Sequence, residues 1–184
     1  GGSNPFTPTN KYFMEIQFTK ICEQTHLWHT FVSDISSEIL IEDISKCPVI
    51  RYDNNLKRHC LKPIGSINQL VERLCSKDFH YQIIELIKNT PKLYGSRWDK
   101  NEVDGFYETT HILCTVYNES PGFWHNIHID QSLDVASGMF FFDLVHNNDK
   151  ATKFYNSPLD NPYYTCPTTA GNGWFLANNR NSWH

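Results

Sequence analysis

The amino-acid sequence has no long hydrophobic run. No stretch approaches the roughly 20 consecutive apolar residues that a membrane-spanning helix requires. The first residues also lack the charged and apolar regions of a secretory signal. We therefore expect a soluble protein that has no membrane partner.

Paired cysteines and an excess of basic residues are missing as well. The six cysteines are scattered and include no C-x-x-C pair, which favours reduced thiols and a cytoplasmic location over a disulfide framework. A formal net charge of -4 offers no basic field to nucleic-acid phosphates, so a nucleic-acid partner is not supported. The 184 residues suit one domain that spans 1–184.

Two amphipathic helices are predicted near the middle of the chain, over about 66–90. Ser66 and Gln69 have the spacing of a capping box, and apolar residues follow at helical intervals. A second helix is expected over Asp78–Lys88, before the break at Pro91. We interpret both helices as supports for a core that lies elsewhere.

Most of the remaining pattern is typical of β-strands. Polar and apolar residues alternate over 11–20, and 48–52 is a shorter candidate. From about Tyr107, short strands separated by turn residues are expected to form the core over 107–184. These candidates are His111–Tyr117, Trp124–Asp130, Gly138–His146, Thr152–Tyr155 and Trp174–Ala177. The pattern predicts a mainly β fold with supporting helices and a jelly-roll core, cupin-like and built as a double-stranded β-helix.

The strongest chemical pattern is His128-Ile129-Asp130, combined with His184 at the last position. In an extended strand, positions i and i+2 point to the same side, so one imidazole and one carboxylate can reach a metal ion together. Two histidines and one carboxylate leave three adjacent positions of an octahedral ion open, as non-haem Fe(II) oxygenases require. We therefore predict that His128, Asp130 and His184 bind a catalytic metal. Zinc accepts the same ligands. The alternative for His128 and Asp130 is a cross-strand hydrogen bond on a solvated face, and the alternative for His184 is a terminal residue without a role.

The order of these features resembles a known superfamily. After H-x-D come an apolar strand at Gly138–Leu144, a glycine turn at 170–173 and the final Ser182-Trp183-His184. This order over roughly 107–184 resembles the prolyl-hydroxylase-like members of the Fe(II)/2-oxoglutarate-dependent dioxygenases. The resemblance implies Fe(II), 2-oxoglutarate and O2, and a peptide or small-molecule substrate. The implied reaction hydroxylates a C–H bond of a peptidyl or amino-acid substrate and releases succinate and CO2.

The resemblance also implies two contacts to 2-oxoglutarate. The family's tyrosine upstream of H-x-D best matches Tyr117, for which an ordinary core or rim position is the alternative. The family's cation beyond the second histidine has no equivalent, because the sequence stops at His184. Either the final strands are missing, or the core is circularly permuted and Lys11, at the head of the strand over 11–20, binds the 5-carboxylate. The alternative for Lys11 is a solvated strand end.

Residues near the triad receive structural roles. His125 has the opposite parity to His128 on a regular strand, so it is expected to face away from the metal unless a bulge intervenes. Three tryptophans are expected to pack around the pocket. They are Trp124, Trp174 and Trp183.

Two other functions fit the same sequence. One is a catalytically silent jelly-roll domain that binds a ligand or partner, and the other is a zinc hydrolase that needs neither oxygen nor 2-oxoglutarate. Fold alone cannot choose among the three functions. Iron-dependent conversion of 2-oxoglutarate to succinate would separate the oxygenase from both alternatives.

Overall fold

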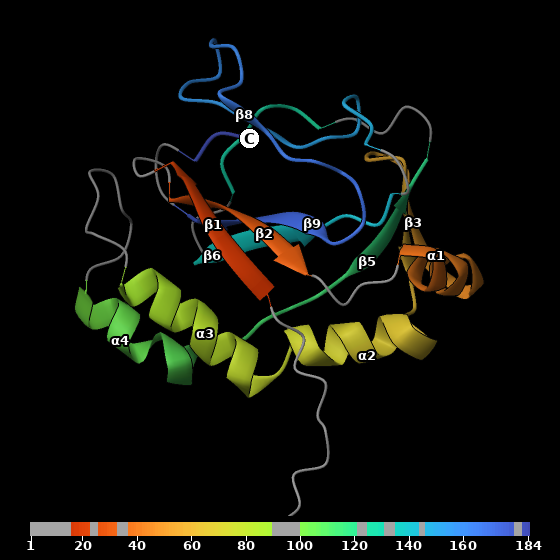
Figure 1. The fold of residues 1–184 in the computed structure, drawn as a ribbon, viewed down its shortest axis with the longest axis horizontal. Helices are drawn as coiled ribbons and strands as arrows, with labels where there is room; N and C mark the ends of the chain where they lie inside the picture. Colours follow the sequence, from red (N-terminus) through yellow and green to blue (C-terminus); the bar gives the residue numbers. More distant parts are fainter. Residues whose placement is uncertain are drawn as a thin grey trace, which may run out of the picture.

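The computed structural model describes most of the chain. The described ranges are 16–22, 26–32, 37–89, 100–120, 125–130, 135–143, 146–178 and 182–184. Within them the chain is a mixed α/β protein with several small antiparallel sheets (Figure 1). No closed barrel or jelly roll is identified in these ranges, so the mainly β prediction understated the helices. No helix in the described part of the chain has the length and hydropathy needed to cross a membrane.

The central sheet joins strands from both ends of the sequence. It contains β1 (Ile16–Cys22), β2 (Leu27–Val32), β9 (Asn172–Ala177) and β6 (Ala136–Phe140), in the order β1-β2-β9-β6. All three pairings are antiparallel. The strand predicted over 11–20 is confirmed as β1 for its described residues, and the strand predicted at Trp174 is confirmed within β9.

Alternate residues of β2 and β9 face two different hydrophobic layers. Trp28 and Phe175 pack with Ile83 against the helices, whereas Trp174 and Leu176 point to the other face and pack with Phe154. Because both faces are covered, β9 is buried at all four of its central positions. The sheet is therefore the middle layer of the molecule.

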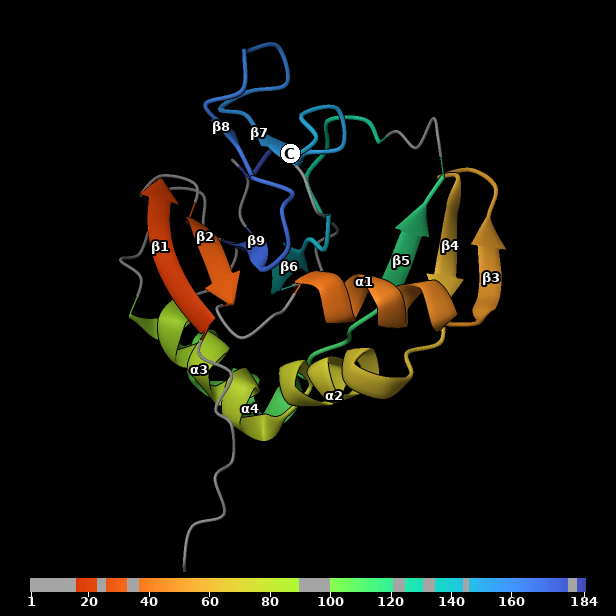
Figure 2. The same ribbon diagram turned by 45° about the vertical axis from the view of Figure 1, so that its right-hand side comes forward.

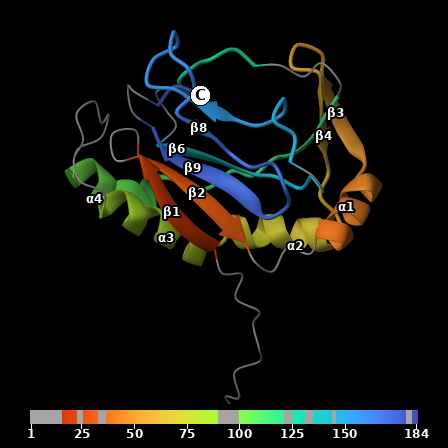
Figure 3. The same ribbon diagram turned by 45° about the horizontal axis from the view of Figure 1, so that its top comes forward.

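Four helices lie within the described residues. They are α1 (Ser37–Lys46), α2 (Gly65–Leu74), α3 (Lys77–Lys88) and α4 (Lys100–Thr109). Figure 3 shows α2, α3 and α4 along one side of the central sheet. The two predicted helices are confirmed as α2 and α3, but α1 was missed, and α4 occupies residues where strands were expected to begin.

The predicted capping box of the first helix is wrong. α2 begins at Gly65 after Ile64, which provides no side-chain cap. The backbone N–H and the hydroxyl of Ser66 instead both donate to the Asp43 carboxylate of α1. These hydrogen bonds lower the pKa of Asp43, and the carboxylate satisfies the start of α2 from a neighbouring helix.

A second sheet stands beside α1 (Figure 2). It contains β3 (Val49–Asp53), β4 (Arg58–Leu61) and β5 (Val116–Glu119), in the order β3-β4-β5. The strand predicted over 48–52 is confirmed as β3. The strand predicted over 111–117 is reduced to β5, because residues 110–115 form no regular structure after α4.

A third, short layer lies on the face of the central sheet that the helices leave open. It contains β7 (Lys153–Phe154), β8 (Tyr164–Thr165) and the C-terminal segment 182–184, seen above the sheet in Figure 1. Phe154 is fully buried between this layer and the central sheet. The strands predicted over 138–146 and 152–155 are shorter than expected, and 125–130 is not a regular strand.

Candidate metal centre

The backbone brings the two predicted histidine ligands together. The His128 N–H donates to the His184 carbonyl at 2.9 Å, and the His184 N–H donates to the His128 carbonyl at 3.0 Å. Such a reciprocal pair puts the two side chains on the same side of an antiparallel ladder. On the other edge, the Tyr155 N–H donates to the Trp183 carbonyl at 3.0 Å. The segment 182–184 is thus hydrogen-bonded on both edges.

The three predicted ligands form one cluster. Asp130 Oδ1 lies 3.5 Å from His128 Nε2 and 3.7 Å from His184 Nε2. One ligand atom from each residue lies within 4.8 Å of the others, and no other group of three such residues occurs within the described ranges. Both Asp130–histidine distances are longer than a charge-assisted hydrogen bond, which spans about 2.7–2.9 Å. Two ligand atoms that are each about 2.1 Å from one ion are roughly 3.0–3.4 Å apart. The distances between Asp130 Oδ1 and the two Nε2 atoms would therefore need to shorten only slightly to hold a metal.

Backbone carbonyls fix the orientation of both imidazoles. His128 Nδ1 lies 2.8 Å from the Asn126 carbonyl oxygen, and His184 Nδ1 lies 3.1 Å from the Ser182 carbonyl oxygen. A carbonyl oxygen can only accept, so Nδ1 of each ring is the donor. In the neutral ring, Nε2 then keeps its lone pair on the side of Asp130. Metal-binding histidines are oriented in this way by their outer nitrogen.

The cluster is closed on one side and more open on the other. The His184 side chain is 8% exposed, against 34% for His128 and 20% for Asp130. Its ring centroid lies 5.3 Å from that of Trp174 and 6.0 Å from that of Phe154. Burial lowers the pKa of His184, although Asp130 partly opposes the shift. The imidazole is therefore neutral at pH 7, which is the form that binds metals.

His125 is a site residue that sequence parity missed. Its Nδ1 lies 3.0 Å from His128 Nδ1, and the two ring centroids are 4.2 Å apart. The parity argument does not apply here, because alternation holds only in a regular strand and 125–130 is irregular. The contact is with the outer nitrogen of His128, and His125 is not in the three-residue cluster, so its expected orientation away from the metal stays a prediction. His125 Nδ1 also lies 3.4 Å from the Asn126 carbonyl oxygen, which is the oxygen that accepts from His128 Nδ1. The H-x-x-H spacing was the only pattern that could have indicated it.

The structure describes only one of the two predicted 2-oxoglutarate contacts. Lys11 lies outside the described residues. Tyr117 lies on β5 opposite Cys60, and its ring is covered by the Arg58 guanidinium, whose Cζ is 4.1 Å from the ring centroid. Among the described residues, no hydrogen bond or ring contact links Tyr117 to the triad. Both contacts remain predictions, and Arg58 is a cation that the sequence pattern did not single out.

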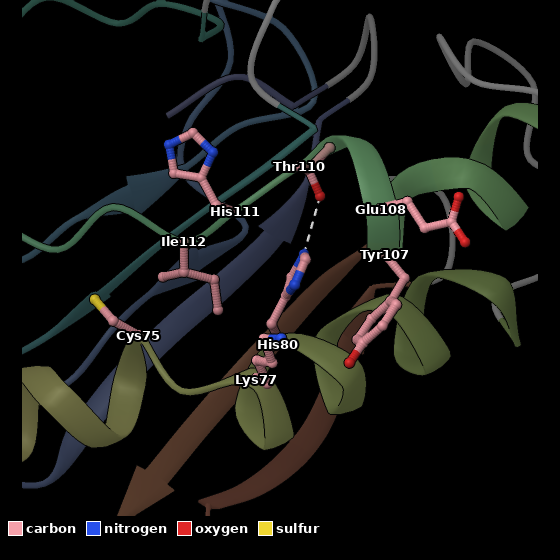
Figure 4. Close-up of a pocket in the computed structure, with 8 residues that line it drawn as sticks. All are labelled: Cys75, Lys77, His80, Tyr107, Glu108, Thr110, His111 and Ile112. Carbon is pink, nitrogen blue, oxygen red and sulfur yellow. Dashed lines mark hydrogen bonds between the residues drawn. The ribbon is translucent and has the colours of Figure 1, made fainter.

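A separate pocket lies at the ends of α2, α3 and α4 (Figure 4). Its volume is about 580 Å³, and none of its lining residues belongs to the triad. His80 Nε2 lies 2.9 Å from Thr110 Oγ1, while Cys75 and Glu108 lie at opposite ends. Because these side chains do not converge on one point, the pocket lacks the geometry of a catalytic centre.

The chain matches no protein-family model, no curated protein and no solved structure. Its function therefore has to be inferred from the site. Two imidazoles and one carboxylate form a cluster in which backbone carbonyls orient both imidazoles and which is open toward His128 and Asp130. Such a set suits a divalent transition metal that keeps positions for further ligands. Of the sequence-predicted site residues, the structure brings together His128, Asp130 and His184.

Proposed function

We propose that the chain is an Fe(II)- and 2-oxoglutarate-dependent oxygenase. It hydroxylates a C–H bond of a peptidyl or amino-acid substrate and releases succinate and CO2. The observation that carries the proposal is the arrangement of His128, Asp130 and His184, in which both Nε2 atoms are directed at one carboxylate by hydrogen bonds at Nδ1. The resemblance of the H-x-D region to the prolyl-hydroxylase-like oxygenases supports the choice of iron.

The proposal includes a double-stranded β-helix core. The central sheet and the layer made by β7, β8 and 182–184 face each other across a hydrophobic cluster. That cluster contains Leu27, Phe154 and Leu176, all 0% exposed. Two antiparallel layers around a shared interior are what a jelly roll requires, and they support this finer description of the fold.

The protein residues have three tasks in this proposal. His128, Asp130 and His184 would hold Fe(II) and leave three adjacent positions for 2-oxoglutarate and O2. Iron held there would activate O2, whose two oxygen atoms would oxidise 2-oxoglutarate to succinate and CO2 and a substrate C–H group to C–OH. The aromatic rings beside His184 keep water from the closed side, whereas His128 and Asp130 leave a side from which a substrate can approach.

Metal loading without oxygen tests the proposal most simply. Anaerobic addition of Fe(II) and then 2-oxoglutarate should produce the weak visible charge-transfer band of the chelate, and admission of oxygen should yield succinate. His128→Ala should abolish both results. His59→Ala is a matched control, because His59 lies on β4 and contacts Tyr52 instead of the triad.

Three outcomes would reject the oxygenase. A band or succinate yield that is equal in wild type and His128→Ala would remove the triad from the reaction. Iron-independent hydrolysis by the zinc-loaded protein, without succinate, would favour the hydrolase. Binding of a partner with no turnover under either condition would favour the silent domain.

A further inference from the structure

Two cysteines meet where the helical layer adjoins the chain that leads to β5. Cys75 ends α2, and its backbone N–H donates to the Val71 carbonyl at 2.9 Å. Cys114 belongs to the irregular stretch 110–115 between α4 and β5. A side-chain hydrogen bond joins the two thiols, although α3 and α4 separate them in the sequence. Both cysteines are free thiols in the structure.

The burial pattern of 110–115 explains why Cys114 turns toward the helices. Thr110, Ile112 and Cys114 are half-buried, whereas the residues that alternate with them are exposed. A period of two is that of an extended chain, so these three side chains point to one side. Ile112 packs against the cluster of Trp28 and Ile83, which identifies that side as the inner one. Cys114 is therefore directed inward by its own segment.

The pair is accessible from the pocket at the ends of α2, α3 and α4. Cys75 and Ile112 both line this cavity, and Figure 4 shows the Cys75 sulfur at the end where Ile112 lies. Cys75 is exposed, whereas Cys114 is half-buried. A small reagent that enters the pocket therefore reaches Cys75 first. None of the residues that line the pocket belongs to the candidate metal centre.

The two thiols are suited to different steps of a thiol–disulfide exchange. Only a thiolate attacks a disulfide. Burial raises the pKa of Cys114 to about 12, and the hydrogen bond and charge of Cys75 contribute to this rise. Cys114 is thus protonated at pH 7 while Cys75 is reduced. Once Cys75 is bonded to another sulfur, its charge is gone and Cys114 loses its proton more easily.

We propose that Cys75 and Cys114 form a reversible disulfide when the folded protein meets a small disulfide such as oxidised glutathione. The Cys75 thiolate attacks one sulfur of the reagent, and one reduced thiol leaves. Cys114 then gives up its proton and attacks the Cys75 sulfur, and the second reduced thiol leaves with that proton. Two protein thiols are oxidised, and one small disulfide is reduced to two thiols. The new bond ties the end of α2 to the segment before β5.

Oxidised glutathione, added to the folded protein without denaturant, tests the inference. Wild type should lose two of its six thiols without retaining glutathione, and dithiothreitol should restore them. Peptide mapping should find Cys75 joined to Cys114. Retention of all six thiols, a lasting glutathione adduct on Cys75, or a disulfide between other cysteines overturns the inference.

Serine variants test the order of the two steps. Cys114→Ser should hold glutathione on Cys75, because no second thiol displaces it, and Cys75→Ser should keep Cys114 as a free thiol. Cys22→Ser is a matched control, because Cys22 is also half-buried but lies on β1, and it should form the disulfide as wild type does. Loss of two thiols by Cys75→Ser at the wild-type rate contradicts the inference. If a variant does not fold, the peptide map of wild type still decides.

Thermal unfolding provides a readout that does not depend on thiol counting. The bond closes a loop of about 40 residues, and the entropy that the unfolded chain loses predicts a rise in Tm of up to roughly 8–16 °C. Dithiothreitol should reverse this rise, and Cys75→Ser should not show it. A lower Tm for the disulfide-bonded protein than for the reduced protein would contradict the inference, because the native fold would then resist the bond.

Discussion

Asp130→Asn should separate stability from metal binding. In the metal-free protein, the Asp130 carboxylate faces two Nε2 atoms at 3.5 and 3.7 Å, and both rings carry their proton on Nδ1. A negative charge opposite two lone pairs is unfavourable. An asparagine amide can donate to Nε2 instead, so the substitution should not destabilise the metal-free protein.

The expected magnitudes differ sharply from those of an ordinary ion pair. We expect the metal-free variant to match wild type or to gain up to about 1 kcal/mol, the typical net value of one hydrogen bond. If Asp130 instead formed buried ion pairs with charged imidazoles, its neutralisation would cost about 3–5 kcal/mol. In wild type, a metal at a hundredfold excess over its Kd adds about 2.7 kcal/mol. For a chain of this size, that raises Tm by about 5–11 °C.

Thermal and urea unfolding with and without Co²⁺ measure both effects. Wild type should show the metal-dependent rise in Tm, and Asp130→Asn should lose most of it while keeping its metal-free stability. A metal-free Asp130→Asn protein that is less stable than wild type by 3 kcal/mol or more would refute the reasoning, because the cluster would then be held by ion pairs.

Three further predictions concern other residues. His125→Ala should lower metal affinity by at most about tenfold, measured by calorimetry, because His128 Nδ1 keeps the Asn126 carbonyl as acceptor; a complete loss would make His125 a ligand. Gly173→Ala should lower the free energy of unfolding, measured in urea, by about 1–3 kcal/mol, because the added Cβ would collide with the Met139 carbonyl oxygen. Gly105→Ala on α4 places its Cβ in open space and should raise that free energy by roughly 0.5–1 kcal/mol. Burial lowers the pKa of His80 below its ordinary 6.5, and the charge of His111 lowers it by a smaller amount. As the pH drops through 6.5, the unfolded chain therefore binds a proton at His80 before the folded protein does, and the stability of the fold should decrease. His80→Gln should flatten that slope, and an unchanged slope would show that His80 does not contribute.

The pattern of apolar residues was sufficient to predict an element that buries a single hydrophobic face. The helix over 78–88 has apolar residues at helical spacing, and it appears as α3 with Ile83 and Ile84 buried. Its N-cap, Ser76, was not predicted. The same pattern failed where contacts between distant segments determine how an element begins or whether it forms. α2 takes its cap from Asp43, which lies on another helix, and α4 contains Gly105 and few apolar residues, so its helical character was hidden.

The candidate site was predictable in composition but not in all its geometry. The three candidate ligands were recognisable because two histidines and one carboxylate in this order are typical of metal sites. Their actual alignment depends on the reciprocal hydrogen bonds between His128 and His184, which join segments far apart in the sequence. The position of His125 depends on the irregular backbone over 125–130.

Anaerobic equilibrium dialysis against Fe(II) tests the central claim most directly. We predict about one tightly bound ion per chain in wild type, as expected for a mononuclear site. Binding should be lost in His128→Ala, Asp130→Ala and His184→Ala, but retained in His59→Ala. Retention of the ion in all three triad variants, or the absence of stoichiometric binding by a folded wild-type protein, would contradict it.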